Sequence, residues 1–534
     1  MASPTTFDLY DTTLRDGTQQ EGINVSVADK LAIATMIDDL GVGFIEGGWP
    51  GAIPKDTEFF RRAQSELTLK NAVLAAFGAT RKAGVGADVD PQVRALLDAN
   101  TPVITLVAKS DSRHVERALK TTRAEGLAMI TDTVDLLVKQ GRRVIVDAEH
   151  FFDGFRVDPG FGIDAVKASF DAGAETVCLC DTNGGMVPDF VTDIVGQVAA
   201  AVGPEARLGM HAHNDTGCAV ANTLAAVQAG CVHVQGVING YGERTGNADL
   251  IATAANLQIK YGMELLTPEA LADSTRLAHA IAEIVNMPPF PRQPYVGISS
   301  FAHKAGLHAA AIKVDADLYQ HIDPTLVGND MRMLVSEMAG RASIELKGRE
   351  FGIDLSGQKE LLGTVTEKVK EAEAAGYTYD GADASFEMLL RSTMGTAPHY
   401  FEVESWRAIV ENVPGAAHSG DATSEATVKL TAGGVRVVRT GEGNGPVNAL
   451  DSALRLALAR TYPEIDKFEL VDYKVRLLDS EVGTDSITRV MITTTDGTRT
   501  WKTVGVGGNI VEASWEALLD AFIYGLMKLG VPVP

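Results

Sequence analysis

Short apolar, β-branched runs alternate with longer segments of helical periodicity through residues 7–261, and this alternation restricts the possible folds more than any other feature. The predicted strands are Phe7–Arg15, Phe44–Pro50, Leu74–Arg81, Val103–Lys109, Arg143–Phe152, Thr176–Gly184, Arg207–Asp215 and Val232–Gly240. The clearest helical stretches are Ser26–Leu40, Arg123–Lys139, Val187–Ala201, Cys218–Ala229 and Asn247–Tyr261. Such a series of strand and helix pairs within about 250 residues predicts an α/β protein with a closed (β/α)₈ TIM barrel. An open doubly wound sheet more often carries a phosphate-binding fingerprint, and no GxGxxG follows the first strand.

The sequence after this segment changes character. Residues 266–420 are predicted to be mostly helical, with a proline-rich break at Met287–Tyr295 and a Gly-, Ala- and Ser-rich linker at Pro414–Ala426. Strand patterns follow at Val428–Leu430 and Val435–Val438, and then a helix at Val447–Ala459. We expect a barrel at 1–265, helical linker subdomains at 266–420 and a C-terminal α+β domain at 425–534.

The C-terminal part contains a short internal similarity. Gly441–Ala449 reads GEGNGPVNA and Gly505–Ala513 reads GVGGNIVEA, and each stretch opens a predicted helix. The C-terminal domain is therefore predicted to be an internal duplication. Backbone N–H groups at these turns are candidates to receive the carboxylate of an amino-acid effector, and the structural alternative is a module for dimerisation only.

Charge and cysteine content limit the partners. The net charge of -23 repels nucleic acid and anionic membranes, so neither is an expected partner. The four cysteines are sparse and lie in apolar stretches, and Cys178 and Cys180 are predicted to be core residues. The N-terminus has no basic region followed by an apolar run, and no apolar span of ~20 residues occurs. We expect a cytoplasmic protein.

Potential metal ligands gather where the predicted strands end, which is the face of a TIM barrel that carries the chemistry. His211 and His213 are two residues apart on the seventh strand, so both imidazoles point to the same side. With Asp16 after the first strand they form a set of two histidines and one carboxylate, which suits a divalent cation with open positions for substrate. The structural alternative is a pair of buried histidines that satisfy hydrogen bonds in the core.

Two further polar residues follow strand ends. Arg15 is a candidate to stabilise a developing oxyanion, and its structural alternative is an ion pair with Glu243 or Asp181. Glu149 is a candidate base or orienting group, with pairing to Arg15 as the structural alternative.

Taken together, LRDG at 14–17, HAHND at 211–215 and GYGERTGNADL at 240–250 resemble the acyl-CoA-condensing branch of the DRE-TIM metallolyases, which contains isopropylmalate, homocitrate and citramalate synthases. Phe301–His308 resembles the linker motif of that family, and residues 425–534 resemble its regulatory domain, so the resemblance covers nearly the whole chain. Residues 147–154 and 380–387 look most like the long bacterial citramalate synthases. The substrates implied are pyruvate and acetyl-CoA.

The resemblance also implies roles for individual residues. Asp16, His211, His213 and Asn247 would hold a divalent metal ion, which sequence does not distinguish among zinc, manganese, magnesium and cobalt. Arg15 would polarise the keto oxygen and Thr182 would bind the 2-oxo acid carboxylate. His308 and Tyr319 would come from the linker, in this family often reaching into the barrel of the partner in a homodimer, and His308 is a second candidate base. Thr18 replaces the glutamate of the common LRDGEQ motif, so no role for that glutamate is carried over.

Other readings use the same barrel. A larger acceptor, 2-oxoisovalerate or 2-oxoglutarate, would give isopropylmalate or homocitrate, and the size of the pocket would decide between them. Phe77, Thr105 and Val107 are candidates to line that pocket. A metal-dependent retro-aldol lyase or a biotin-dependent carboxyltransferase is disfavoured by the linker motif and the duplicated domain. A non-catalytic scaffold would not need so many polar groups at one rim. From the resemblance, the C-terminal domain is expected to confer feedback control by isoleucine, the end product of the pathway.

Overall fold

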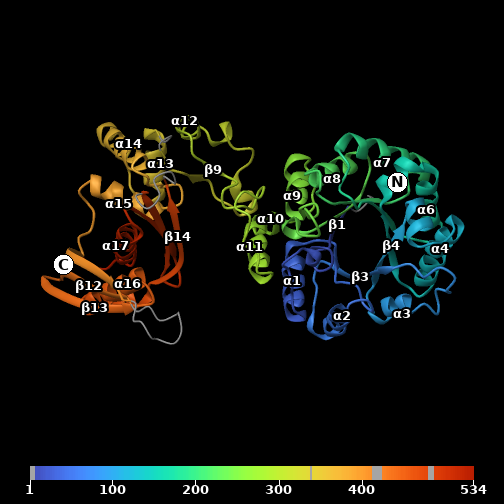
Figure 1. Cartoon of the computed structure of the whole chain (residues 1–534). Coiled ribbons are helices and arrows are strands. Elements are labelled where there is room, and N and C mark those ends of the chain that lie inside the picture. Colours follow the sequence, from blue (N-terminus) through green and yellow to red (C-terminus); the bar gives the residue numbers. More distant parts are fainter. Residues whose placement is uncertain (1–6, 337–339, 412–423, 479–485) are drawn as a thin grey trace. The chain divides into compact units, whose positions relative to one another are not determined.

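Two compact units make up the chain in the computed structural model (Figure 1), which describes residues 7–336, 340–411, 424–478 and 486–534. The first unit comprises Met1–Phe301 and Ile322–Asp330. The second comprises Ala302–His321 and Met331–Pro534.

The first unit is built on a closed barrel of parallel strands arranged in sequence order, which confirms the predicted TIM barrel. The strands are β1 Asp8–Asp11, β2 Phe44–Glu46, β3 Val73–Ala79, β4 Val103–Lys109, β5 Arg143–Glu149, β6 Thr176–Asp181, β7 Leu208–Ala212 and β8 His233–Gly236. Strand β1 pairs with β2 and with β8, and this double pairing closes the sheet.

Several strands end earlier than the sequence predicts, because the chain turns at the carboxyl rim. β1 ends at Asp11 rather than at Arg15, since the Asp11 carboxylate accepts hydrogen bonds from the backbone N–H and the hydroxyl of Thr13. This is an Asx-type turn, which lifts the following residues out of the sheet. Arg15 and Asp16 therefore lie on the loop above the barrel rather than within a strand.

Helices surround the barrel, and their ends follow local capping signals. They are α1 Val27–Leu40, α2 Pro54–Glu66, α3 Pro91–Asp98, α4 Arg123–Lys139, α5 Phe151–Val157, α6 Pro159–Asp171, α7 Pro188–Val202, α8 Ala219–Gln228 and α9 Leu250–Ala255. Ser26 forms a reciprocal capping box with Asp29 at the start of α1. The helix predicted from Asn247 begins only at Leu250, because the Asp249 carboxylate caps the N–H groups of Ile251 and Ala252.

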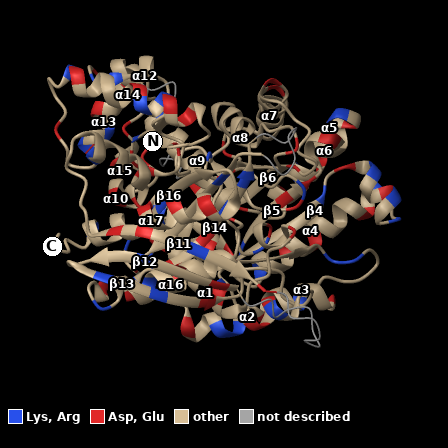
Figure 2. Ribbon diagram, turned by 60° about the vertical axis from the view of Figure 1, so that its left-hand side comes forward, with Lys and Arg blue, Asp and Glu red and all other residues tan. Residues whose placement is uncertain are grey.

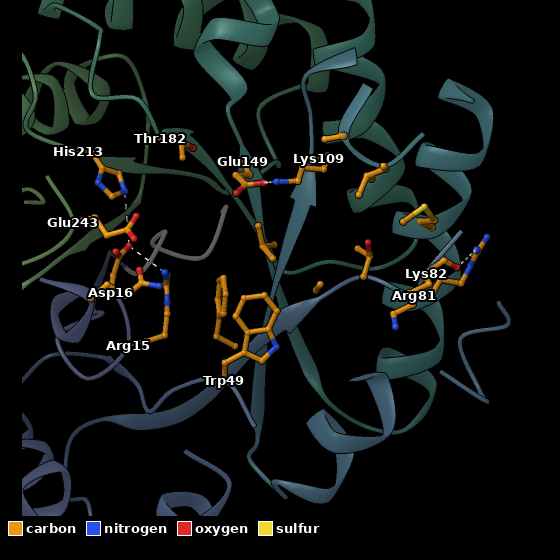
Figure 3. Close-up of a pocket in the computed structure, with 18 of the residues that line it drawn as sticks. Arg15, Asp16, Trp49, Arg81, Lys82, Lys109, Glu149, Thr182, His213 and Glu243 are labelled. Atoms are coloured by element: carbon orange, nitrogen blue, oxygen red, sulfur yellow. Dashed lines mark hydrogen bonds and ion pairs between the residues drawn. The ribbon is translucent and has the colours of Figure 1, made fainter. Parts of the chain in front are cut away.

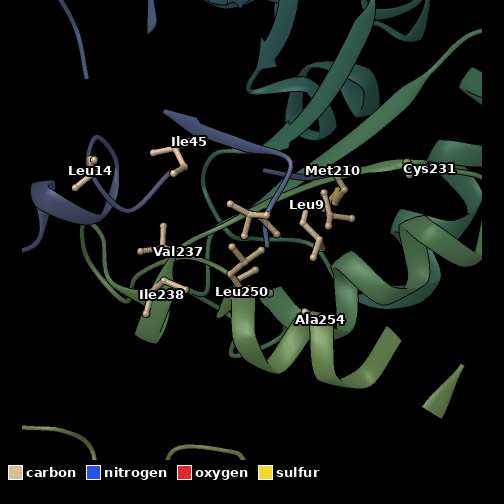
Figure 4. Close-up of a cluster of buried hydrophobic side chains, with 14 of the residues drawn as sticks. Leu9, Leu14, Ile45, Met210, Cys231, Val237, Ile238, Leu250 and Ala254 are labelled. Atoms are coloured by element: carbon tan, nitrogen blue, oxygen red, sulfur yellow. The ribbon is translucent and has the colours of Figure 1, made fainter. Parts of the chain in front are cut away.

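Apolar side chains between the strands and helices form the core of the first unit (Figure 4). Leu9 on β1 and Met210 on β7 are buried, as is Leu250 at the start of α9. Two short helices, α10 Pro268–Ala272 and α11 Ser274–Ile284, pack against α1 on the same unit.

The second unit combines helices with two antiparallel sheets. Its helical part holds α12 Gly306–Ile312, α13 Arg341–Glu350, α14 Lys359–Ala374 and α15 Asp383–Thr393, with a short parallel pair formed by β9 Ala302–His303 and β10 Arg332–Met333. The first sheet is β11 Phe401–Val410, β12 Ser424–Ala432 and β13 Val435–Gly443, followed by α16 Pro446–Leu458. The second sheet is β14 Glu469–Leu477, β15 Thr488–Thr495 and β16 Thr500–Gly507, followed by α17 Ile510–Lys528. The same order occurs twice, as the predicted duplication requires.

A further departure from the sequence prediction is a strand in place of a predicted helical segment. Residues 401–410 were expected in the helical segment, but they form β11, which pairs antiparallel with β12. A bulge between Val403 and Ser405 shifts the inward-facing residues from Val403 to Trp406, so the period of two that marks a strand is broken in the sequence. Most of the linker predicted at Pro414–Ala426 lies outside the described residues, and its last three residues belong to β12. The other domain limits stay predictions.

Acidic and basic residues are interspersed along the helices (Figure 2). On α2, for example, Arg61 pairs with Glu58 and Arg62 pairs with Glu66.

Within the described part of the chain, none of the helices combines the length and the apolar character needed to cross a membrane.

Candidate active site

A cavity of about 680 Å³ opens at the carboxyl ends of the barrel strands (Figure 3). Asp16 and His213 line one end of it, and Arg81 and Lys82 lie at the other end in the same view. The side chains between them include Arg15, Trp49, Phe77, Val107, Lys109, Glu149 and Thr182. The cavity is therefore long, polar at both ends and partly aromatic between them.

Asp16, His211 and His213 come together as a buried cluster. Asp16 Oδ2 lies 3.3 Å from His211 Nε2 and 3.9 Å from His213 Nε2, and the two Nε2 atoms are 3.4 Å apart. A cation bound at roughly 2.0–2.2 Å from each donor would place the donors about 3–3.5 Å from one another. The three donor atoms are thus close to the spacing that a shared divalent cation requires.

The fourth candidate ligand, Asn247, is held beside His213. These two residues form an isolated bridge, and Asn247 Nδ2 donates to the carbonyl of Tyr241 at 3.0 Å. Gly246 has a φ of +89°, and a Cβ there would lie 1.9 Å from the carbonyl oxygen of Gly240, so only glycine fits before Asn247. Asn247 Oδ1 is buried and has no hydrogen-bond partner among the described residues. An oxygen left in that state fits a site that receives a cation.

The protonation of Asp16 and His213 also suits a cation. Burial would raise the pKa of Asp16, but the positive charge of Arg15 and the hydrogen bond with His211 outweigh it and hold the pKa well below its usual range. Burial and the neighbouring His211 lower the pKa of His213 to about 4. At pH 7 Asp16 is therefore a carboxylate and His213 a neutral imidazole, which are the forms that bind metals. Burial would lower the pKa of His211, but the hydrogen bond with Asp16 outweighs it and raises the pKa.

Arg15 is fixed from three sides. Its Nε lies 2.5 Å from Glu46 Oε2 and its Nη1 lies 3.1 Å from Asp16 Oδ2, while its guanidinium stacks 3.9 Å from the ring centre of Phe77. Glu46 is fully buried at the end of β2. The predicted structural alternative, an ion pair of Arg15 with Glu243 or Asp181, is wrong, because Arg15 pairs with Glu46 and Asp16 instead. Nη2 of Arg15 has no partner within the described residues and can donate to a substrate.

Glu149 and Thr182 line the cavity from neighbouring strands. The Glu149 carboxylate pairs with Lys109, so its predicted structural alternative, pairing with Arg15, is wrong. Thr182 Oγ1 accepts the backbone N–H of His150 at 2.8 Å, which leaves its hydroxyl hydrogen available to donate. A hydroxyl held in this way can bind a carboxylate in the cavity.

Of the three residues predicted to line the acceptor pocket, two line the cavity and one does not. Phe77 and Val107 line the cavity. Thr105 is not a lining residue, because its hydroxyl is buried 2.6 Å from the hydroxyl of Tyr10 in the barrel interior. Sequence reasoning missed Glu46, Lys109 and Trp49, which contact or line the site. An acidic residue ending the apolar run of β2 was the signal available for Glu46.

His308 and Tyr319 belong to the second unit. Their rings stack with centres 4.1 Å apart, so the structure brings these two candidates together. Leu307 and Leu318, their neighbours in sequence, are 74% and 60% exposed. This segment of the second unit thus presents an aromatic pair beside two exposed apolar side chains.

A second cavity, of about 450 Å³, lies among the elements of the duplicated sheets. It is lined by Asn444, Gly445, Pro446, Val447, Asn448, Asp451, Leu470, Tyr473 and Ile510. The start of α16 has no side-chain cap, whereas at α17 the Asn509 side chain already accepts the N–H groups of Val511 and Glu512. The first of the two predicted glycine-rich turns therefore lacks the side-chain cap that occupies two backbone donors at the second.

Comparison with known proteins places this geometry in a family. Residues 6–281 match the family model described as HMGL-like, residues 295–376 match the homocitrate synthase post-HMGL domain, and residues 380–526 match the LeuA allosteric (dimerisation) domain. The chain is 62% identical to the (R)-citramalate synthase of Streptomyces coelicolor over 98% of this chain and 97% of that protein. It is 46% identical to those of Synechocystis, over 98% and 96% of the two chains, and of Aquifex aeolicus, over 97% and 98%.

Proposed function

Because the chain belongs to the HMGL-like family, in its acyl-CoA-condensing branch near the citramalate synthases, we propose that it joins acetyl-CoA to pyruvate and releases (R)-citramalate and CoA. The observation that carries the proposal is the buried cluster of Asp16, His211 and His213 beside a fixed Arg15 in one cavity. The full-length similarity to citramalate synthases favours pyruvate as the acceptor.

The family implies a divalent metal ion, and the residues at the rim fit one. Asp16, His211, His213 and Asn247 would hold it, since they combine two imidazole nitrogens, a carboxylate and an unpaired buried amide oxygen. When bound there, the cation would supply Lewis-acid polarisation of the 2-oxo acid. Zinc, manganese, cobalt and magnesium all accept such donors.

Arg15 and Thr182 would orient the acceptor. The Thr182 hydroxyl would donate to the carboxylate of pyruvate, because its oxygen already accepts from His150. Arg15 would donate through Nη2 to the keto oxygen, where negative charge develops during attack. Glu46, Asp16 and Phe77 fix the guanidinium before substrate binds, so little reorganisation is needed in the transition state.

A base must remove a proton from the methyl group of acetyl-CoA. Glu149, in the barrel cavity, and His308, in the second unit with Tyr319 stacked on it, are the two candidates. The enolate carbon then forms a bond to the keto carbon of pyruvate, and the keto oxygen gains a proton. Water cleaves the thioester and releases CoA as the free thiol.

A release assay for CoA thiol tests the reaction. Purified enzyme receives acetyl-CoA with pyruvate, 2-oxoisovalerate or 2-oxoglutarate, each with and without a chelator. We expect the highest kcat/KM with pyruvate, and loss of activity on chelation that returns with added cation. Faster turnover of 2-oxoisovalerate would make the chain an isopropylmalate synthase, and activity that survives complete metal removal would reject the mechanism.

A homodimer is the assembly that the LeuA dimerisation domain supports. The exposed Leu307 and Leu318 around His308 and Tyr319 are suited to burial against a second copy, and we propose that this segment completes the partner's barrel. Sedimentation should give a dimer. Mixing inactive Asp16→Ala with inactive His308→Ala should restore part of the activity, since one of the two mixed sites would then carry both native residues.

The cavity at α16 is the proposed site for an isoleucine effector. Its mixture of apolar side chains and uncapped backbone donors suits a branched-chain amino acid, consistent with feedback in isoleucine biosynthesis. A side chain at Gly445 would meet open space, so Gly445→Leu should fill the cavity without backbone strain. Calorimetry should detect isoleucine binding to the unaltered chain and not to this variant. Equal binding of isoleucine, leucine and valine would reject selective feedback.

A further inference from the structure

A hydrogen-bonded chain runs from the metal cluster into the barrel interior through two residues that have no assigned role. His211 Nδ1 lies 2.8 Å from Gln235 Oε1, and Gln235 Nε2 donates to Asp147 Oδ1 at 2.7 Å. The three residues lie on β7, β8 and β5 and are between 1% and 5% exposed. Water therefore does not compete for these hydrogen bonds.

The surroundings of Gln235 fix which way its amide points. Its NH₂ group faces the Asp147 carboxylate and lies 3.5 Å from His233 Nε2. His233 Nδ1 lies 3.4 Å from Asp8 Oδ2, which favours the proton on Nδ1 and leaves Nε2 as an acceptor. Two acceptors thus face the amide nitrogen, so the amide oxygen must face His211.

This orientation determines the tautomer of His211. An amide oxygen only accepts, so His211 Nδ1 must carry the hydrogen, and the lone pair of a neutral ring then lies on Nε2. Nε2 is the atom that lies 3.3 Å from Asp16 Oδ2 and 3.4 Å from His213 Nε2. By contrast, Nδ1 of His213 is buried and has no partner among the described residues. Of the two imidazoles, His211 therefore has a hydrogen bond at the ring nitrogen opposite the cluster, and His213 has none among the described residues.

We propose that Gln235, oriented by Asp147, is a positioning residue that fixes the ring and tautomer of His211 so that Nε2 is presented to the cation. This inference rests on the proposed metal site and extends it to residues that touch neither cation nor substrate. Partners of this kind orient metal-binding histidines, and their loss typically weakens metal binding by about 10- to 100-fold.

Cobalt binding tests the proposal without using catalysis. Full-length protein, stripped of metal, is titrated with Co²⁺ against a chromophoric chelator, and the d–d absorption band is recorded. The variants are Gln235→Met, which removes the acceptor at similar side-chain length, and Asp147→Asn, which removes the fixed acceptor that orients the amide. The control is Cys178→Ala, a buried change whose sulfur lies within 4.8 Å of Asp147 but makes no hydrogen bond to Gln235. Thermal unfolding of the metal-free proteins is measured alongside.

We expect Gln235→Met to raise the Kd for Co²⁺ at least tenfold and to alter the d–d band, Asp147→Asn to do so to a smaller extent, and Cys178→Ala to stay within twofold. Wild-type affinity and spectrum in Gln235→Met would overturn the proposal, as would an equal loss in Cys178→Ala. An unchanged Kd in Asp147→Asn would remove Asp147 from it. Unaltered protein that binds Co²⁺ but forms no citramalate would reject the proposed reaction and leave this inference intact.

Discussion

The ion pair between Glu46 and Arg15 gives the sharpest test of the proposed site. Glu46→Gln keeps the size of the side chain but removes its charge. The amide oxygen can still accept from Arg15 Nε, but the NH₂ group then faces the hydroxyl of Tyr10, which donates to Glu46 Oε1 at 3.0 Å in the native chain. Arg15 keeps its contact with Asp16 at 3.1 Å. The guanidinium thus loses one of its two anionic neighbours.

Both stability and rate should fall. Removing one partner of a buried ion pair costs about 3–5 kcal/mol, and the surviving contact with Asp16 places the expected loss in the free energy of unfolding near the lower limit. Loss of one preorganised oxyanion donor costs about 10²- to 10³-fold in kcat. Because Asp16 and Phe77 still hold Arg15, we expect a fall of about 10- to 100-fold in kcat.

Urea unfolding and the CoA-thiol assay measure the two effects on the same preparation. Glu175→Gln is the matched control, since Glu175 pairs with Arg143 at 2.7 Å but with both side chains more than a third exposed. That variant should lose less than about 1 kcal/mol and keep its rate. If Glu46→Gln matched this control in both measurements, Arg15 would not depend on Glu46 for its position and the account of the oxyanion donor would fail.

Further predictions concern the metal ligands, the acceptor and the second unit. Asp16→Ala or His211→Ala should abolish turnover and bound metal by elemental analysis; near-normal activity in either would remove the cation from the mechanism. Thr182→Val should raise the KM for pyruvate about tenfold or more without changing the KM for acetyl-CoA, and Thr182→Ser should not. In the second unit, burial raises the pKa of Asp520 to about 7, although a hydrogen bond from Ser385 lowers it. The native state then holds this proton more tightly than the unfolded chain does. The contribution of protonated Asp520 to the free energy of unfolding is therefore complete below about pH 4 and is lost as the pH rises to about 7. In urea unfolding, Asp520→Asn should remove up to about 4 kcal/mol of this pH-dependent loss in the free energy of unfolding. If that free energy changed with pH as it does in the unaltered chain, the raised pKa of Asp520 would be contradicted.

The sequence predicted the barrel because parallel strands buried on both faces leave a strong apolar signal. It also predicted the cluster at the rim, because Asp16 and His211 stand at strand ends, where a TIM barrel carries polar groups. Strand β11 was missed since a bulge breaks its alternation. The partner of Arg15 was also misassigned, because Glu46 is far from it in sequence and comes beside it only when β1 and β2 pair in the folded sheet.

The sequence did not predict which polar residues support the site from inside the barrel, below the rim. Tyr10, Thr105, Gln235 and Asp147 are buried polar groups where aliphatic side chains would pack at lower desolvation cost. Their hydrogen bonds form two chains that lead to the rim. In one, Tyr10 donates to Glu46, which accepts from Arg15. In the other, Asp147 accepts from Gln235, which contacts His211. Each chain therefore ends at a group with a proposed role in the reaction. The interior of this barrel then has two functions, to fill the core and to hold the oxyanion donor and a metal ligand in place, and only the second requires polar residues at these positions.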